Sequence, residues 1–194
     1  NYIMQNGNLK NIMYLSVFIA LCLRSYQNLM AGFAEEVFRL DEQGLGNLLA
    51  ASGIGALSAA LILSVRGKTE GLTKVYVFGA ALTSIALLFF VSTIKVQFAL
   101  LAMVFVGGFA VATSLSAHTL IQNTVIDEYR ARVISINLAI SVGGPAFGTL
   151  AIGWLAEFIG FQFALGASAL AALIAVIFIG PIVLSSSKYI EFGT

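Results

Sequence analysis

Three polar side chains interrupt the first long apolar run of the sequence. Arg24, Gln27 and Asn28 occupy positions i, i+3 and i+4, so a helix places all three on one face. If that helix crosses a bilayer, a charge near its middle costs at least about 2.5–3.5 kcal/mol, and Arg24 should face water or a partner. One cation beside two amides is typical of a polar pathway. The alternative is a structural pair between Arg24 and an acid outside these helices.

The long apolar runs contain no Asp or Glu. Proton-coupled transport normally uses a carboxylate inside the membrane, so a proton carrier would have to lie outside this segment. His118 is the single histidine, and a histidine side chain can exchange a proton near neutral pH. Because His118 stands near the end of the fourth apolar run, we expect a polar residue at the membrane interface, with a proton-transfer role as the alternative.

Glycines and one proline indicate where helices approach each other and where one helix bends. Gly55 has an alanine four residues before it and another four residues after it, and Gly144 and Gly148 have the same spacing. Small residues at this spacing allow close backbone contact in lipid. Pro145 removes one backbone hydrogen bond, so a kink or a local widening of the helix is expected. Packing is the simpler role for these four residues, and a gating role is the alternative.

A dense charge cluster stands before the fifth apolar run. It contains Asp127, Glu128, Arg130 and Arg132. Glu128 and Arg132 are spaced i, i+4 in the favourable order, and leading acids suit the N-terminus of a helix. Two interpretations stay open: a capped helix with basic anchors at the lipid headgroups, or a salt-bridged gate formed by Glu128, Arg130 and Arg132.

The sequence lacks the parts of an enzyme. It has one histidine and one cysteine, Cys22, and no cluster of His, Cys and carboxylates that would bind a metal. It also lacks a Ser–His–acid set and a glycine-rich phosphate loop. A net charge of +1 gives no basic surface for nucleic acid. We therefore expect no catalytic residues, no metal, no cofactor and no nucleic-acid partner.

The elements that position these residues are membrane helices. Of 194 residues, 59% are hydrophobic and only 10% are charged, with a mean hydropathy of +0.97. An all-α integral membrane protein follows, because no soluble domain of this size could bury so much apolar surface. Each apolar run is long enough to span a bilayer, and none alternates as a barrel strand would. The six predicted spans are about 11–34, 44–65, 75–94, 96–119, 133–156 and 161–184.

Basic residues predict the orientation of the six helices. Seven lie on the side that carries both termini: Lys10, Arg66, Lys68, Lys74, Arg130, Arg132 and Lys188. Only Arg39 and Lys95 lie on the other side. The positive-inside rule then places both termini in the cytoplasm.

Several segments resemble one transporter family. The run 123–133 (NTVIDEYRARV), which enters the apolar helix with the Gly-Pro pair, resembles the connection between helices ten and eleven of major facilitator superfamily transporters. Segments 33–37 (FAEEV), 44–46 (GLG) and 51–57 (ASGIGAL) are similar to helices seven and eight of one branch of that superfamily. This branch contains the enterobactin exporter and macrolide-efflux-type permeases.

The resemblance implies that residues 1–194 form the C-terminal six-helix domain of a twelve-helix transporter, with a 3+3 inverted repeat. Each half supplies one wall of a midplane cavity, and the halves rock to expose it to each side in turn. We expect a multi-pass protein of the inner or plasma membrane that acts as a proton-coupled exporter, or antiporter, of small amphipathic molecules. Arg24, Gln27 and Asn28 would line its cavity.

Two other hypotheses stay open. The chain lacks an initiator Met, which favours a missing N-terminal half, but a self-sufficient six-helix protein could instead pair with a second copy. A non-transporting membrane scaffold is the third hypothesis. The expected partners are therefore a small-molecule substrate, the lipid bilayer, and either the other half of the same transporter or a second copy.

Overall fold

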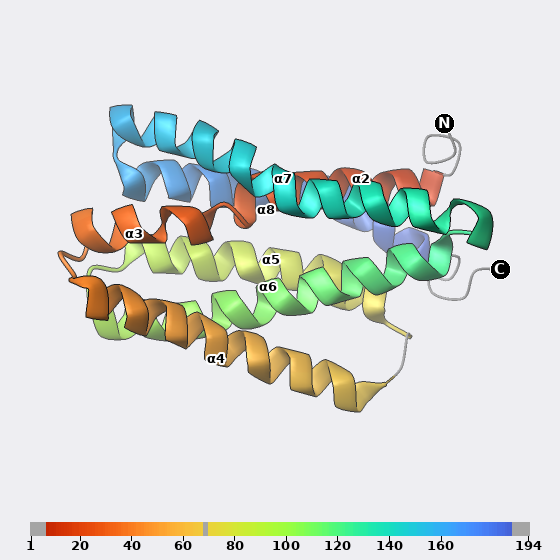
Figure 1. Cartoon of the computed structure of the whole chain (residues 1–194), viewed down its shortest axis with the longest axis horizontal. Coiled ribbons are helices and arrows are strands. Elements are labelled where there is room, and N and C mark those ends of the chain that lie inside the picture. The colour runs from red at the N-terminus through yellow and green to blue at the C-terminus, as the bar shows by residue number, and fades with distance from the viewer. Residues whose placement is uncertain (1–6, 68–69, 188–194) are drawn as a thin grey trace.

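A computed structural model describes residues 7–67 and 70–187, and its regular elements are all helical (Figure 1). In chain order they are α2 (Gly7–Phe18), η1 (Ile19–Leu23), α3 (Tyr26–Glu36), α4 (Glu42–Arg66), α5 (Leu72–Ser92), α6 (Val96–Thr124), α7 (Asp127–Ile159) and α8 (Phe161–Ser185). Lys68 and Lys188, two of the basic residues that predict the orientation, lie outside the described residues.

The prediction of six membrane-spanning helices is confirmed. Six helical segments are long and apolar enough to cross a bilayer, and the first of them, Leu9–Glu36, is built from α2, η1 and α3 together. The start of α2 and the end of α8 lie at the same end of the bundle, as an even number of spans requires (Figure 1).

The helices extend beyond the apolar runs that predict them. Residues 122–132 read as a polar connection, yet α6 continues to Thr124 and α7 begins at Asp127. Only Val125 and Ile126 leave the helical conformation, with ψ angles of 129° and 150°. An apolar run measures the part of a helix in hydrocarbon, whereas backbone hydrogen bonding carries the helix on into the headgroup region.

Local signals explain the ends of α4. The Asp41 carboxylate accepts a hydrogen bond of 2.9 Å from the Gly44 N–H and so caps the N-terminus of the helix. Gly67 follows the last residue with a φ of +58°, the left-handed conformation that glycine adopts at low cost. These two residues determine where the second span begins and where it ends.

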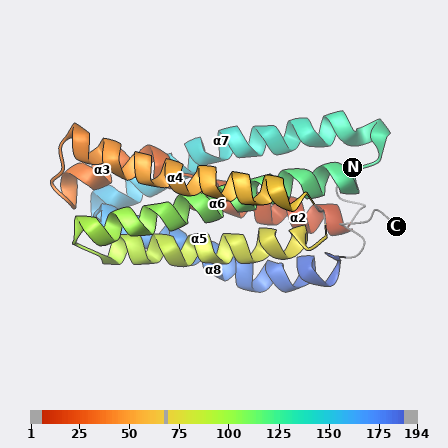
Figure 2. The same cartoon turned by 90° about the horizontal axis from the view of Figure 1, so that it is seen from below.

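The helices pack as a bundle in which α5 is the most enclosed and α4 and α7 are the edges. Half of the residues in the most apolar 18-residue stretch of α5 are buried, against 17% in the corresponding stretches of α4 and α7. α4 and α7 lie at opposite edges of the bundle in Figure 1, whereas α5 lies beside α6 and α8, as Figure 2 also shows. The apolar side chains exposed on the edge helices suit a lipid or protein environment rather than water.

Close contact between α4 and α6 depends on two glycines. A Cβ atom at Gly55 would collide with the carbonyl oxygen of Val104, and one at Gly107 would collide with the carbonyl oxygen of Ser52. Backbone therefore packs directly on backbone, which is how small residues hold helices together in lipid. Gly55 stands in this contact.

Two apolar clusters fill the interior toward opposite ends of the bundle. One is centred on the rings of Phe33, Phe38 and Phe90, whose centroids lie 4.9 to 5.7 Å apart. The other surrounds Tyr76 and Leu120. Tyr26 of the first cluster and Tyr76 of the second also line the cavity described below.

Candidate functional site

A cavity of about 420 Å³ opens between the first span and helices α5, α6 and α7. Its volume lies in the range of small-molecule sites. Polar side chains reach it from all four spans: Ser16, Arg24, Tyr26, Gln27, Tyr76, Thr83, Thr113, Ser114, His118, Asn137 and Ser141. Leucine, valine and alanine side chains make up much of the rest, so the cavity combines an apolar wall with a few polar groups.

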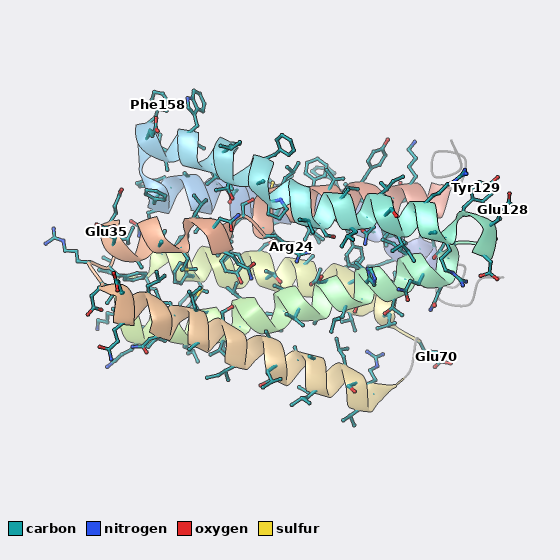
Figure 3. All side chains as sticks on the ribbon, viewed as in Figure 1. Arg24, Glu35, Glu70, Glu128, Tyr129 and Phe158 are labelled. Atoms are coloured by element: carbon teal, nitrogen blue, oxygen red, sulfur yellow. The ribbon has the colours of Figure 1, made fainter. Side chains whose placement is uncertain are left out.

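Arg24 lies near the middle of the bundle's length. Glu35 and Phe158 mark one end of the bundle and Glu128 and Tyr129 the other, and Arg24 lies between them (Figure 3). The structure therefore places the one charged side chain of the apolar runs at mid-depth and on the wall of a cavity.

The first span is irregular where it meets the cavity. One π-helical turn, η1, follows α2, and the Arg24 N–H closes it with a hydrogen bond of 3.0 Å to the Ile19 carbonyl oxygen. Arg24 and Ser25 then form a turn before α3 begins at Tyr26. π-Turns inside helices are frequent at functional sites because they redirect side chains.

The three polar residues predicted to share one helix face have different surroundings. Arg24 and Gln27 line the cavity, whereas Asn28 is not among its lining residues. Instead, the Asn28 Nδ2 donates a hydrogen bond of 3.0 Å to the Thr149 Oγ1 on α7. The structure thus brings two of these residues together on the wall and directs the third to a contact between helices.

A polar network joins the irregular part of the first span to the proline of α7. The Pro145 carbonyl oxygen accepts hydrogen bonds from Thr149 Oγ1 at 2.7 Å and from Ser25 Oγ at 3.2 Å. Ser25 Oγ also lies 2.7 Å from the Leu21 carbonyl oxygen. With the Asn28 contact to Thr149, the network crosses between the two helices at two points.

Gly144 and Gly148 let α7 approach the first span at this level. A Cβ atom at Gly148 would collide with the Leu21 carbonyl oxygen and the Ser25 hydroxyl. One at Gly144 would lie 2.8 Å from the Ala20 Cβ. Pro145 stands between them inside α7, and its ring cannot donate a hydrogen bond to the carbonyl of Ser141, one of the lining residues.

Two further polar contacts lie on the cavity wall. The Asn137 Nδ2 of α7 lies 3.4 Å from the His118 Nδ1 of α6. On the opposite helices, the Tyr76 hydroxyl donates to the Ile12 carbonyl oxygen at 3.2 Å and lies 3.0 Å from Ser16 Oγ. His118, expected at the membrane interface, is therefore also a lining residue.

The cavity is electropositive. Arg24 and His118 are its basic side chains, and the described residues that line it include no Asp or Glu. Within the described part of the chain, the Arg24 guanidinium has no ion pair and no side-chain hydrogen bond. Arg24 lines the cavity and its donors are unpaired there, so a ligand in the cavity could accept from them.

The charge cluster at the start of α7 lies at the far end of the bundle from Glu35 (Figure 3). Arg130 pairs with Asp127 at 2.6 Å, and this is the ion pair found among residues 7–67 and 70–187. The pairing of Glu128 with Arg132, which the i, i+4 spacing favours, does not form there. Arg130 reaches back to the acid one turn earlier, and Glu128 and Arg132 are exposed to solvent.

Metal chemistry has no candidate centre in the described residues, where no group of three His, Cys, Asp or Glu side chains comes together. What the cavity offers instead is reversible binding: one guanidinium, amides, hydroxyls and an apolar wall. Six helices able to span a membrane, four of which line this cavity, define a multi-pass membrane protein.

The family follows from the sequence match. The family model of the Major Facilitator Superfamily matches residues 13–189, so the chain belongs to this superfamily, whose members are transporters rather than enzymes. Neither the comparison with curated proteins nor the comparison with solved structures found a match.

Proposed function

We propose that this chain is the C-terminal half, helices seven to twelve, of a transporter that moves small amphipathic molecules across the cell membrane by alternating access. The observation that carries the proposal is the cavity between the first, third, fourth and fifth spans, with Arg24 on its wall at mid-depth. Transport needs a site that binds a solute at mid-depth and opens to each side in turn.

The bending of α7 supplies the movement. Pro145 weakens the helix next to the cavity, and Gly144 and Gly148 allow it to slide against the first span without side chains in the way. In this proposal a six-helix domain with a 3+3 inverted repeat rocks against its counterpart, and the domain contact lies on the edge helices.

The edge helices support a partner of similar construction. α4 and α7 are the least buried spans, and both are apolar. The N-terminal half of the same transporter fills that place in the proposal, and a second copy of the chain is the alternative. Chemical crosslinking from a cysteine introduced on α4 distinguishes them, because a homodimer crosslinks to twice its mass and a two-half transporter crosslinks within one chain.

Export driven by protons rests on the resemblance to the enterobactin exporter and macrolide-efflux branch. No Asp or Glu stands within the apolar runs of the chain, so the proton-carrying carboxylate belongs to the partner half. Glu128, Arg130 and Arg132 then form the cytoplasmic gate at the end of α7, where exposed charges of both signs can pair across the closed entrance.

The gate is cytoplasmic only if both termini are, which the distribution of basic residues predicts. Asp41, in the loop after the first span, is the residue to tag. Labelling of a cysteine at this position by an impermeant reagent from outside the cell supports the orientation, and labelling only after the membrane is broken contradicts it.

Flux in reconstituted vesicles tests the function itself. The complete protein is inserted into vesicles containing a pH-sensitive dye, and an acid interior is imposed. A transporter of this kind releases protons faster when an amphipathic substrate is added outside, whereas a membrane scaffold gives the same proton leak with and without the substrate.

A further inference from the structure

We infer that the cavity selects anionic amphipathic solutes, binding a carboxylate, sulfonate or phosphate group at Arg24 and an apolar body against α6 and α7. The inference rests on the proposed function and names its substrate class. It starts from the charges of the lining residues, which are basic or uncharged throughout the described wall.

Arg24 is the group that recognises the anion. Its guanidinium lines the cavity at mid-depth and has no acidic partner among the described residues. An isolated cation at this depth is costly, and a bound anion relieves that cost by pairing with it. The planar guanidinium suits a carboxylate because two parallel N–H donors meet two oxygens.

The neighbouring threonine hydroxyls do not offer a free donor to an anion. Thr83 and Thr113 also line the cavity, but their hydroxyls donate to carbonyl oxygens of their own helices, Gly79 and Phe109, each at 2.7 Å. These threonines present an acceptor or a methyl group rather than a free donor. The guanidinium therefore carries the strongest unused donors on the wall.

His118 adds an imidazole ring to the same cavity wall. Its Nδ1 lies 3.4 Å from the Asn137 Nδ2, an arrangement in which the amide holds the ring in place from the adjacent helix. A cation in the cavity would meet the Arg24 guanidinium with no carboxylate on the described wall to offset it, so this wall discriminates by charge.

The rest of the wall fits an apolar body. Leu23 lies beside Arg24, and Val111, Leu115, Leu138 and Val142 approach from α6 and α7. A solute with a charged end and a hydrocarbon or aromatic end therefore satisfies both parts of the cavity. A small inorganic anion would leave the apolar wall uncovered, and a neutral hydrocarbon would leave Arg24 unpaired.

Three probes of one shape test the inference: phenylbutyrate, phenylbutanol and phenylbutylammonium. Equilibrium dialysis measures the binding of each to the complete purified protein, after subtraction of the uptake by protein-free micelles. The expected result is binding of phenylbutyrate about tenfold or more tighter than phenylbutanol, because one charge-assisted contact is added, with phenylbutylammonium the weakest. Equal binding of the three, or no binding of phenylbutyrate, overturns the inference without any variant.

Three variants assign the preference to Arg24. Arg24→Gln should lower the affinity for phenylbutyrate to that for phenylbutanol. Arg24→Lys should retain part of the preference for phenylbutyrate, because lysine keeps the charge but lacks the two parallel N–H donors of the guanidinium. Arg39→Gln is the matched control, since it removes the same charge from an exposed loop residue. A preference for the anion that persists in a folded Arg24→Gln protein overturns the inference.

Uptake of the same probes into vesicles separates this inference from the proposed function. Transport of all three at similar rates leaves a transporter but overturns the charge selection. Selective binding of phenylbutyrate without movement of any probe supports the charge selection and contradicts the transport function.

Discussion

The Ser25 hydroxyl of the first span lies 3.2 Å from the Pro145 carbonyl oxygen of the fifth span, and it shares its one proton between this oxygen and the Leu21 carbonyl oxygen at 2.7 Å. Ser25 follows the π-turn η1 and Arg24, and Pro145 stands inside α7 at a position that lacks a backbone N–H donor. The two positions are therefore in direct contact beside the cavity. A movement of either helix must break or exchange this bond, so the contact couples the two helices.

Gly148→Ala tests the close approach that permits this contact. The new Cβ collides with the Leu21 carbonyl oxygen and the Ser25 hydroxyl, so α7 must shift away from the first span. We expect a loss of about 1–3 kcal/mol in the free energy of unfolding, measured in mixed micelles with a denaturing detergent. Gly143→Ala is the control on the same helix, because nothing lies within 4 Å of its Cβ position. Equal effects of both substitutions would contradict the packing described here.

The bond between Asn28 and Thr149 is tested by a double-mutant cycle. Asn28→Ala and Thr149→Val each remove one partner of the 3.0 Å contact, so together they should cost less than the sum of their separate effects. Coupling energies of side-chain hydrogen bonds in membranes average about 0.6 kcal/mol, which sets the expected size. Asn47 is exposed on α4, and the cycle of Asn47→Ala with Thr149→Val should be additive. Additivity in both cycles would show that Asn28 and Thr149 are not coupled by a hydrogen bond.

Pro145→Ala separates movement from binding. Alanine restores the N–H that can donate to the Ser141 carbonyl oxygen, so α7 becomes more regular and bends less readily. We expect a transport rate reduced severalfold, with solute affinity changed little, measured by uptake and by equilibrium dialysis on the same preparation. Pro181→Ala makes the same change inside α8, away from the lining residues, and should leave the rate near that of the unchanged protein. A similar loss in both variants would argue against a special role for Pro145 in transport.

The ion pair at the start of α7 should contribute little to stability. Asp127 and Arg130 are both exposed, so Asp127→Asn should lower the free energy of unfolding by less than about 1 kcal/mol, and added salt should shrink the difference. Glu128→Gln removes a charge at the next position without breaking that pair and is the matched control. A gate role for Glu128 predicts the reverse order for transport, with Glu128→Gln changing the rate more than Asp127→Asn.

The number of spans could be predicted from the sequence, because backbone hydrogen bonding in lipid leaves a helix as the conformation for each long apolar run. Arg24 could also be assigned to a cavity, since a lone charge at mid-membrane is costly unless it faces water or a partner. The ends of α6 and α7 could not be predicted, because hydropathy marks the hydrocarbon and not the helix. The π-turn Ile19–Leu23 carries no proline or glycine that would signal it.

The hydrogen bonds between helices could not be predicted from the sequence, for a different reason. Ser25 and Thr149 look like any serine or threonine of a membrane helix, and most such hydroxyls bond to their own helix, as Thr83 and Thr113 do. Only the packing that Gly148 permits brings Ser25 to α7. The position of His118 along the chain predicts a place near the membrane interface, and only the packing of the helices shows that it also lines the cavity.

Accessibility of Ser141 from both sides of the membrane tests alternating access at the cavity. Ser141 lines the same cavity as Arg24, so Ser141→Cys is made in the complete protein with Cys22→Ser and no other cysteine. Phe178→Cys is the control, since that side chain is 73% exposed on the apolar surface of α8. Alternating access predicts that an impermeant maleimide labels position 141 both in right-side-out and in inverted vesicles, while position 178 stays unlabelled. Labelling of position 141 from one side only, or from neither, would contradict the account.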